Sequence, residues 1–134
     1  MTRRSVSPSE SQIQCAFVQW CRMSEGRYPG LRLAFAVPNG GLRNVITAVR
    51  LKREGARPGV CDWILPVSGF AAGPNSLVRY SSEPIALGIE FKKPGGKMTP
   101  AQKEWADLAR RYGWRVEVCT SAEAAIAIVK EYLA

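Results

Sequence analysis

The stretch GIEFKKPGGKMTPAQ, residues 88–102, places two charges in an otherwise apolar strand and follows them with a glycine-rich loop. Side chains alternate between the two faces of a strand, so Glu90 and Lys92 share one face with Gly88. The other face is apolar, with Ile85, Leu87, Ile89 and Phe91. The pattern predicts an open polar edge beside a buried face. An ion pair with a purely structural role is the alternative, since such pairs are common in strands.

The residues after the loop predict a helix over 99–113. Thr99 fits the N-cap, Pro100 fits the first helical position, and Gly113 fits the stop. Gln102 has two interpretations that the sequence leaves open. It completes a capping box with Thr99, or it points its amide toward Glu90 from the face that carries Trp105.

Working outward from this centre, the remaining patterns alternate between helix and strand periodicity. They predict helices over 7–23, 42–54 and 121–133, and strands over 31–37, 60–66, 85–94 and 114–120. Residues 67–84 are rich in glycine and serine, which indicates a loop or a variable hairpin. We therefore expect one α/β domain over residues 1–134, with residues 1–8 as a flexible N-terminus.

The charge balance indicates a polyanionic partner. Lys and Arg number 19 against 11 Asp and Glu, which gives a net charge of +8 and a pI near 9.7. Nucleic acid fits this excess best, an anionic membrane surface fits it less well, and charge that serves only solubility is the alternative. Two basic runs, 50–57 and 92–97, flank the acidic positions in the sequence and are expected to border one site, although each could also be a solvated face.

The chain contains no histidine, which excludes histidine triads, histidine general bases and most zinc hydrolase sites. The four cysteines show no metal-ligand or disulfide spacing and are expected as small core residues in a reducing cytoplasm: Cys15, Cys21, Cys61 and Cys119. No apolar run is long enough to span a bilayer. Hydrolytic chemistry would therefore use carboxylates, lysine and a hard metal ion.

Asp62 lies in an apolar strand, where a lone buried carboxylate would be costly. Sharing a Mg²⁺ ion with Glu90 would remove that cost, and Lys92 could orient a water and stabilise charge on a phosphate. A partnered Asp at a strand end is the alternative. Glu10 is a third candidate, because helical spacing places it on the face of Ile13 and Phe17. It could equally complete a capping box with Ser7.

At this point several ordered segments resemble one family: SESQIQ (9–14), PNGG (38–41), LKREGARPGVCDWIL (51–65), GIEFKKPGGKMTPAQKEW (88–105) and the closing strand and helix. The chain resembles the virus-type replication–repair nuclease domain (VRR-NUC), a branch of the PD-(D/E)xK nuclease superfamily. The resemblance implies a restriction-endonuclease-like fold, with a central mixed β-sheet flanked by helices. One position departs from the family pattern, because Cys61 stands where a proline usually precedes the catalytic Asp.

The resemblance also implies the site. Asp62, Glu90 and Lys92 would form a Mg²⁺- or Mn²⁺-dependent catalytic core, with the backbone carbonyl of Phe91 as a further metal ligand. Glu10 and Gln102 would support this core from their helices. The expected DNA contacts are Asn39, Arg43, Arg50, Lys52, Arg53, Arg57, Lys93, Lys97 and Lys103.

The expected activity is endonucleolytic hydrolysis of DNA. Compact members of the family resemble Holliday-junction resolvases of phages, so we expect a homodimer that prefers four-way junctions in the host cytoplasm. A flap or nicking nuclease is the alternative within enzymes, and a non-catalytic basic DNA-binding module is the alternative outside them. Apolar residues of 67–84 are the expected dimer contact: Phe70, Leu77, Val78 and Tyr80.

Overall fold

The computed structural model of the chain describes residues 6–38, 45–69 and 83–134. Within these residues the strands form one sheet in the order β1 (Phe35–Ala36), β2 (Trp63–Leu65), β3 (Leu87–Phe91) and β4 (Arg115–Cys119). β2 is antiparallel to both β1 and β3, whereas β3 and β4 are parallel. The sheet is therefore mixed, which confirms the α/β fold expected from the sequence.

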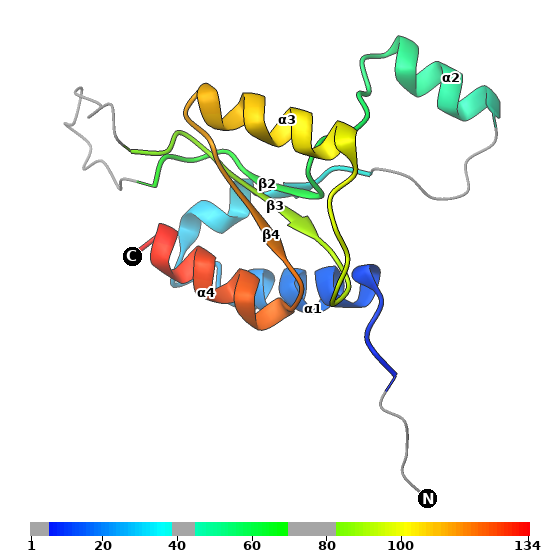
Figure 1. The fold of residues 1–134 in the computed structure, drawn as a ribbon. Helices are drawn as coiled ribbons and strands as arrows, with labels where there is room; N and C mark the ends of the chain where they lie inside the picture. Colours follow the sequence, from blue (N-terminus) through cyan, green and yellow to red (C-terminus); the bar gives the residue numbers. More distant parts are fainter. Residues whose placement is uncertain (1–5, 39–44, 70–82) are drawn as a thin grey trace, which may run out of the picture.

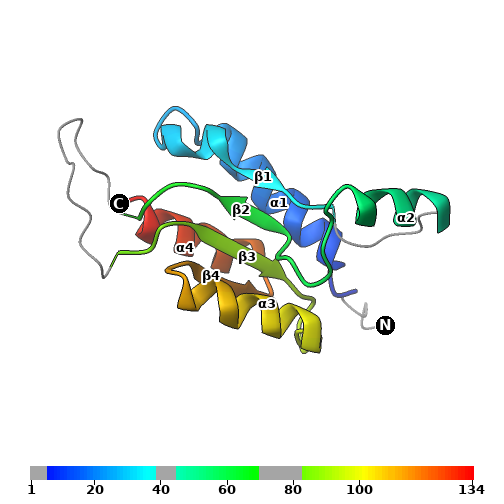
Figure 2. The same ribbon diagram turned by 90° about the horizontal axis from the view of Figure 1, so that it is seen from above.

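Helices cover both faces of this sheet (Figures 1 and 2). α1 (Glu10–Met23) and α4 (Ala122–Tyr132) lie on one face, and α3 (Pro100–Arg111) lies on the other. Phe17 of α1 packs edge-on against Trp63, with ring centroids 4.8 Å apart, and contacts Phe91 at 5.4 Å. The main core thus lies between α1, α4 and the apolar face of β2 and β3.

The ends of the helices show which capping signals are used. Thr99 and Gln102 form the predicted capping box at the start of α3. At α1 the expected box between Ser7 and Glu10 is wrong, because Ser9 is the N-cap and pairs with Gln12. The hydroxyl oxygen of Ser9 accepts a hydrogen bond from the backbone N–H of Gln12. The helix therefore begins two residues later than it would with Ser7 as the N-cap.

The predicted strand over 31–37 is largely wrong. A 3₁₀ turn, η1 (Pro29–Leu33), occupies its first half, and β1 is only two residues long. Pro29 fits the first position of this turn, and Leu31 is buried while Leu33 and Phe35 are 60% and 49% exposed. The alternating pattern therefore does not correspond to one buried strand face.

α2 (Val45–Arg53) extends away from the sheet (Figures 1 and 2), and none of its residues is buried. None of the helices within the described ranges has the length and apolar content that crossing a bilayer needs. The predicted contacts Asn39 and Arg43 lie outside the described residues, as does the proposed dimer segment with Phe70, Leu77, Val78 and Tyr80.

Candidate active site

The sheet brings Asp62, Glu90 and Lys92 together. Asp62 immediately precedes β2, and β2 pairs with β3, which carries Glu90. Glu90 is 2% exposed and Lys92 is 7% exposed, with 3.7 Å between Lys92 Nζ and Glu90 Oε1. The expected open polar edge is therefore wrong for these two side chains. Both charges are buried, and α3 lies over this side of the sheet (Figure 1), from which its residue Gln102 contacts Glu90.

One oxygen of each carboxylate accepts a hydrogen bond from a neighbouring group. The backbone N–H of Phe91 donates to Oδ2 of Asp62 at 2.7 Å, and Nε2 of Gln102 donates to Oε1 of Glu90 at 2.8 Å. The other oxygen of Glu90, Oε2, is buried and has no hydrogen-bond partner among the described residues. A buried acceptor without a donor is costly, so this oxygen needs either a proton shared with Asp62 or a bound cation.

Gln102 satisfies both sequence interpretations at once. Its Oε1 accepts from the N–H of Thr99 at 2.8 Å, which completes the capping box. Since the oxygen of the amide is engaged there, the nitrogen faces Glu90. The start of α3 thus determines the orientation of an active-site carboxylate.

Burial makes this pair of acids hard to ionise together. It raises the pKa of Glu90 to about 8, and the nearby charge of Asp62 adds to the effect, whereas Lys92 opposes it. Burial also raises the pKa of Asp62, against the hydrogen bond from Phe91. The two carboxyls are therefore poised to share a proton at neutral pH unless a cation takes its place.

Glu10 is exposed at the first turn of α1, so the prediction that it points inward is wrong. Its negative charge nevertheless contributes to raising the pKa of both Asp62 and Glu90, which places it near the pair. Since the capping box uses Ser9 and Gln12, the Glu10 carboxylate is not engaged in capping.

The oxygen atoms of this pair fit a hard divalent cation. No cluster of three or more Asp, Glu, Cys or His side chains arranged for a metal occurs within residues 6–38, 45–69 and 83–134. Two carboxylates are nevertheless enough for Mg²⁺, which keeps several of its waters and binds proteins through one or two acids. Such an ion would give Glu90 Oε2 a positive partner, and it would allow Asp62 and Glu90 to be ionised together.

Two glycines beside the site allow a close packing that the sequence interpretation did not identify. A Cβ at Gly59, where φ is +84°, would overlap the carbonyl of Ala101 and lie 3.0 Å from the amide nitrogen of Gln102. A Cβ at Gly88 would lie 2.6 Å from Sγ of Cys61. The Pro58-Gly59 turn before Asp62 was the available signal, but only the tertiary fold shows what these glycines approach.

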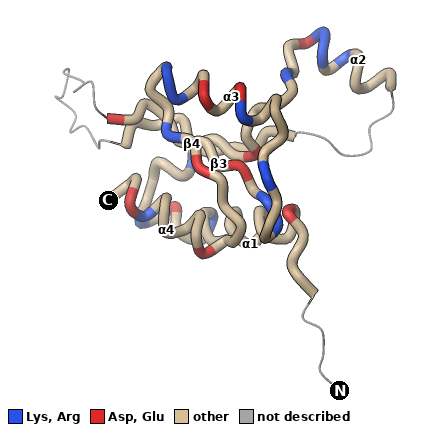
Figure 3. Tube along the Cα trace, viewed as in Figure 1, with Lys and Arg blue, Asp and Glu red and all other residues tan. Residues whose placement is uncertain are grey.

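The described basic candidates lie on the surface: Arg50, Lys52, Arg53, Arg57, Lys93, Lys97 and Lys103 are exposed. Figure 3 shows basic positions on α2 and on the connection from β3 to α3, on the same side of the molecule. Arg50 also pairs with Glu54 at 3.6 Å, a pair that is mostly solvated.

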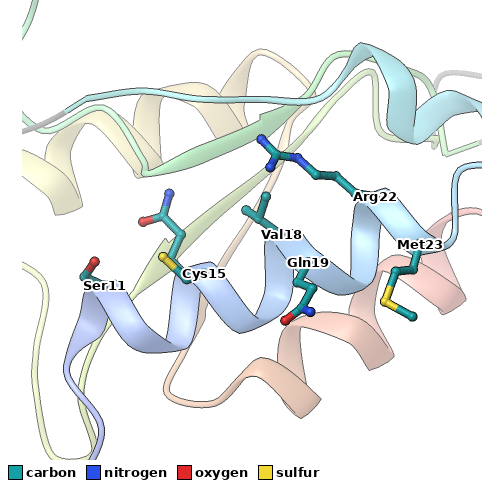
Figure 4. Close-up of a pocket in the computed structure, with 7 residues that line it drawn as sticks. Ser11, Cys15, Val18, Gln19, Arg22 and Met23 are labelled. Carbon is teal, nitrogen blue, oxygen red and sulfur yellow. The ribbon is translucent and has the colours of Figure 1, made fainter.

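A separate hollow of about 540 Å³ runs along α1, lined by Ser11, Gln14, Cys15, Val18, Gln19, Arg22 and Met23 (Figure 4). It contains no carboxylate and none of the predicted site residues. Cys15 in its lining is exposed, so the expectation that this cysteine is a core residue is wrong, whereas Cys21, Cys61 and Cys119 are buried as expected. The chemistry of the hollow does not match the acidic pair, so the candidate site lies at the sheet and not in this hollow.

Comparison with known proteins agrees with this geometry. A solved structure described as a VRR_NUC domain protein superimposes with a TM-score of 0.71 at 22% identity, over 95% of this chain and 89% of that one. This likeness confirms the fold. No curated protein sequence matches the chain. The family model of the VRR-NUC domain matches residues 3–123, so the chain belongs to the VRR-NUC family of nuclease domains.

Proposed function

We propose that the protein is a Mg²⁺- or Mn²⁺-dependent endonuclease that hydrolyses phosphodiester bonds in DNA. The observation that carries the proposal is the buried Glu90 Oε2, which has no hydrogen-bond partner among the described residues. It lies beside a second carboxylate that is also held through one oxygen. Membership of a nuclease family supports the reaction, and the net charge of +8 supports a DNA substrate.

Asp62 and Glu90 would hold the metal ion, with the backbone carbonyl of Phe91 as a further ligand. The bound ion would supply Lewis-acid stabilisation of negative charge on the scissile phosphate. Gln102 keeps Glu90 oriented through its 2.8 Å hydrogen bond. Lys92 would orient the attacking water and stabilise developing charge, because its ammonium is buried and lies 3.7 Å from Glu90. Glu10 would add a third carboxylate at the rim of the site.

Branched DNA, especially a four-way junction, is the proposed substrate. The described part of each chain carries one acidic site, and a homodimer would supply two such sites with the two-fold symmetry of a junction. The four free cysteines are consistent with the proposed setting, the reducing cytoplasm of a phage host.

The test is cleavage of four labelled DNAs: a four-way junction, a flap, a linear duplex and a single strand, each with Mg²⁺ and with EDTA. We expect Mg²⁺-dependent cuts with the junction cleaved fastest, and a dimeric mass by light scattering. Equal cleavage rates on the junction and the linear duplex would show that the protein is a general nuclease without junction selectivity. Binding without any cleavage in Mg²⁺ or Mn²⁺ would instead show a non-catalytic DNA-binding module.

A further inference from the structure

α2 has an apolar face with nothing against it within the described chain. Val45, Ile46 and Val49 are 78%, 81% and 51% exposed. At 100° per residue these three positions fall within one arc of the helix. A helix of nine residues is marginal in water by itself, so a face of this kind implies a partner in the working complex.

The opposite side of α2 is the side that meets the body. Leu51 lines a hollow of about 240 Å³ with Val37, Ala56 and Val60, among others. This contact fixes which way the helix faces. Because Leu51 is directed toward the body, the arc with Val45, Ile46 and Val49 is directed away from it.

The charges around the apolar face indicate what covers it. Arg50, Lys52 and Arg53 lie in the last turn of α2, and the helix contains no acidic residue. Glu54, just beyond it, pairs with Arg50. At 100° per residue Arg53 falls within the same arc, so two copies of this face packed together would bury cations in the interface, and α2 has no acidic residue to pair with them. A polyanion complements them.

We propose that α2 is a DNA-contacting arm whose face of Val45, Ile46 and Val49 packs against unstacked bases at a branch point, while its cations contact the flanking phosphates. Apolar side chains that wedge between bases are an established way for proteins to bind distorted DNA. A continuous duplex offers phosphates but no open base faces, whereas a branch point offers both. The inference rests on the proposed DNA nuclease function and adds a reason for branch selectivity.

The position of the arm supports this assignment. Figure 1 shows α2 extending from the side of the sheet toward which β3 runs, and the chain leads from α2 to Asp62 through residues 54–61. DNA held at the acidic pair would therefore extend toward the arm.

The test is a triple variant, Val45→Ser, Ile46→Ser and Val49→Ser. Serine has nearly the helix propensity of valine and isoleucine, so the change removes apolar surface and leaves the helix and its charges. The matched control is Met23→Ser with Leu108→Ser, which removes apolar side chains that are 80% and 50% exposed on other helices. Circular dichroism checks that each variant folds.

Binding is measured in EDTA to a four-way junction and to a linear duplex, each with 2-aminopurine at the central position. We expect the wild type to brighten 2-aminopurine in the junction, and the triple variant to lose this signal with about tenfold of junction affinity, equivalent to about 1.4 kcal/mol. Duplex affinity should change less than about twofold, since the cations remain. The control should match the wild type.

Unchanged junction binding and fluorescence in the triple variant would overturn the inference. A dimer that the wild type forms and the triple variant loses, by light scattering without DNA, would overturn it too and assign the face to a second copy. Because catalysis is absent in EDTA, this result is independent of cleavage. If the wild-type protein gives the 2-aminopurine signal but never cleaves DNA, the proposed nuclease function is wrong, whereas the proposed role of α2 in DNA binding stands.

Discussion

Gln102 and Glu90 are joined by a 2.8 Å hydrogen bond that determines which oxygen of the carboxylate faces α3. Oε1 receives that bond and lies 3.7 Å from Lys92 Nζ, while Oε2 stays without a partner among the described residues. The amide of Gln102 cannot reverse without losing its bond to Thr99. The side chain of Gln102 therefore both caps α3 and orients the Glu90 carboxylate.

Replacing Gln102 with Ala should reduce cleavage more than loss of the cap alone does. Thr99→Ala removes the cap side chain and should cost about 1 kcal/mol of stability, with cleavage within about threefold of wild type. Gln102→Ala also leaves Glu90 without its donor, so cleavage should fall about tenfold or more, as expected for a hydrogen bond to a charged group. Single-turnover rates and urea unfolding measure the two effects. Equal cleavage losses in both variants would assign Gln102 to capping only.

The metal-free protein should lose stability as pH rises from about 5 to about 8. Burial raises the pKa of Glu90 to about 8 from an ordinary value of 4.5, so the folded state holds a proton that the unfolded chain releases. This contribution is fully present below the unfolded pKa and is lost as pH passes the folded pKa. Thermal unfolding in EDTA across this range measures it.

The matched variant for that series is Glu90→Gln, which stays neutral at every pH. Its melting temperature should be nearly flat from pH 5 to 8, and higher than that of wild type at pH 8. Mg²⁺ should raise the wild-type melting temperature most at high pH, where the acids are ionised. A parallel decline in wild type and Glu90→Gln would place the pH dependence elsewhere.

Gly59→Ala should destabilise the fold more than Gly95→Ala. The two glycines have φ of +84° and +82°, so both substitutions incur the same conformational cost of about 1 kcal/mol. A Cβ at Gly95 meets nothing within 4 Å, whereas at Gly59 it overlaps Ala101. We expect a further cost of about 1–3 kcal/mol at Gly59 in urea unfolding. Equal costs would show that the close approach to α3 is unimportant.

Gly88→Ala should be destabilising in a way that depends on Cys61. The added Cβ would lie 2.6 Å from Sγ of Cys61, which costs about 1–3 kcal/mol by overpacking. In Cys61→Ala the sulfur is gone, so the second substitution Gly88→Ala should cost less there. A double-mutant cycle in urea measures this coupling. Strictly additive free energies would mean that the two residues do not restrict each other.

The sequence predicted elements with strong local signals correctly. Thr99, Pro100 and Gln102 identify the start of α3, because capping depends only on residues a few positions apart. The prediction that one face of β3 is apolar and buried was also correct, because it depends only on alternation between neighbouring residues of the strand. Strand 31–37 failed because alternation alone does not show which side chains reach the core: Leu33 and Phe35 are exposed.

Burial at the site depended on contacts that the sequence does not reveal. Glu90 and Lys92 were expected at an open edge, but both are buried, and Gln102 of α3 contacts Glu90 directly. Glu10 had the correct helical phase but lies in the first turn, where it is exposed. The approach of Gly59 to α3 joins segments more than 40 residues apart, so no local pattern predicts it.

The central claim is that Asp62 and Glu90 act together in metal-dependent cleavage of DNA. Its most direct test is single-turnover cleavage of a four-way junction with Mg²⁺ by wild type, Asp62→Asn, Glu90→Gln and the control Glu117→Gln, an acid on β4 paired with Arg115. Wild type and Glu117→Gln should cleave at similar rates, EDTA should abolish both, and each site variant should lose at least about 10³-fold in rate while still binding DNA. Cleavage in EDTA, or near-wild-type rates for Asp62→Asn or Glu90→Gln, would contradict the account.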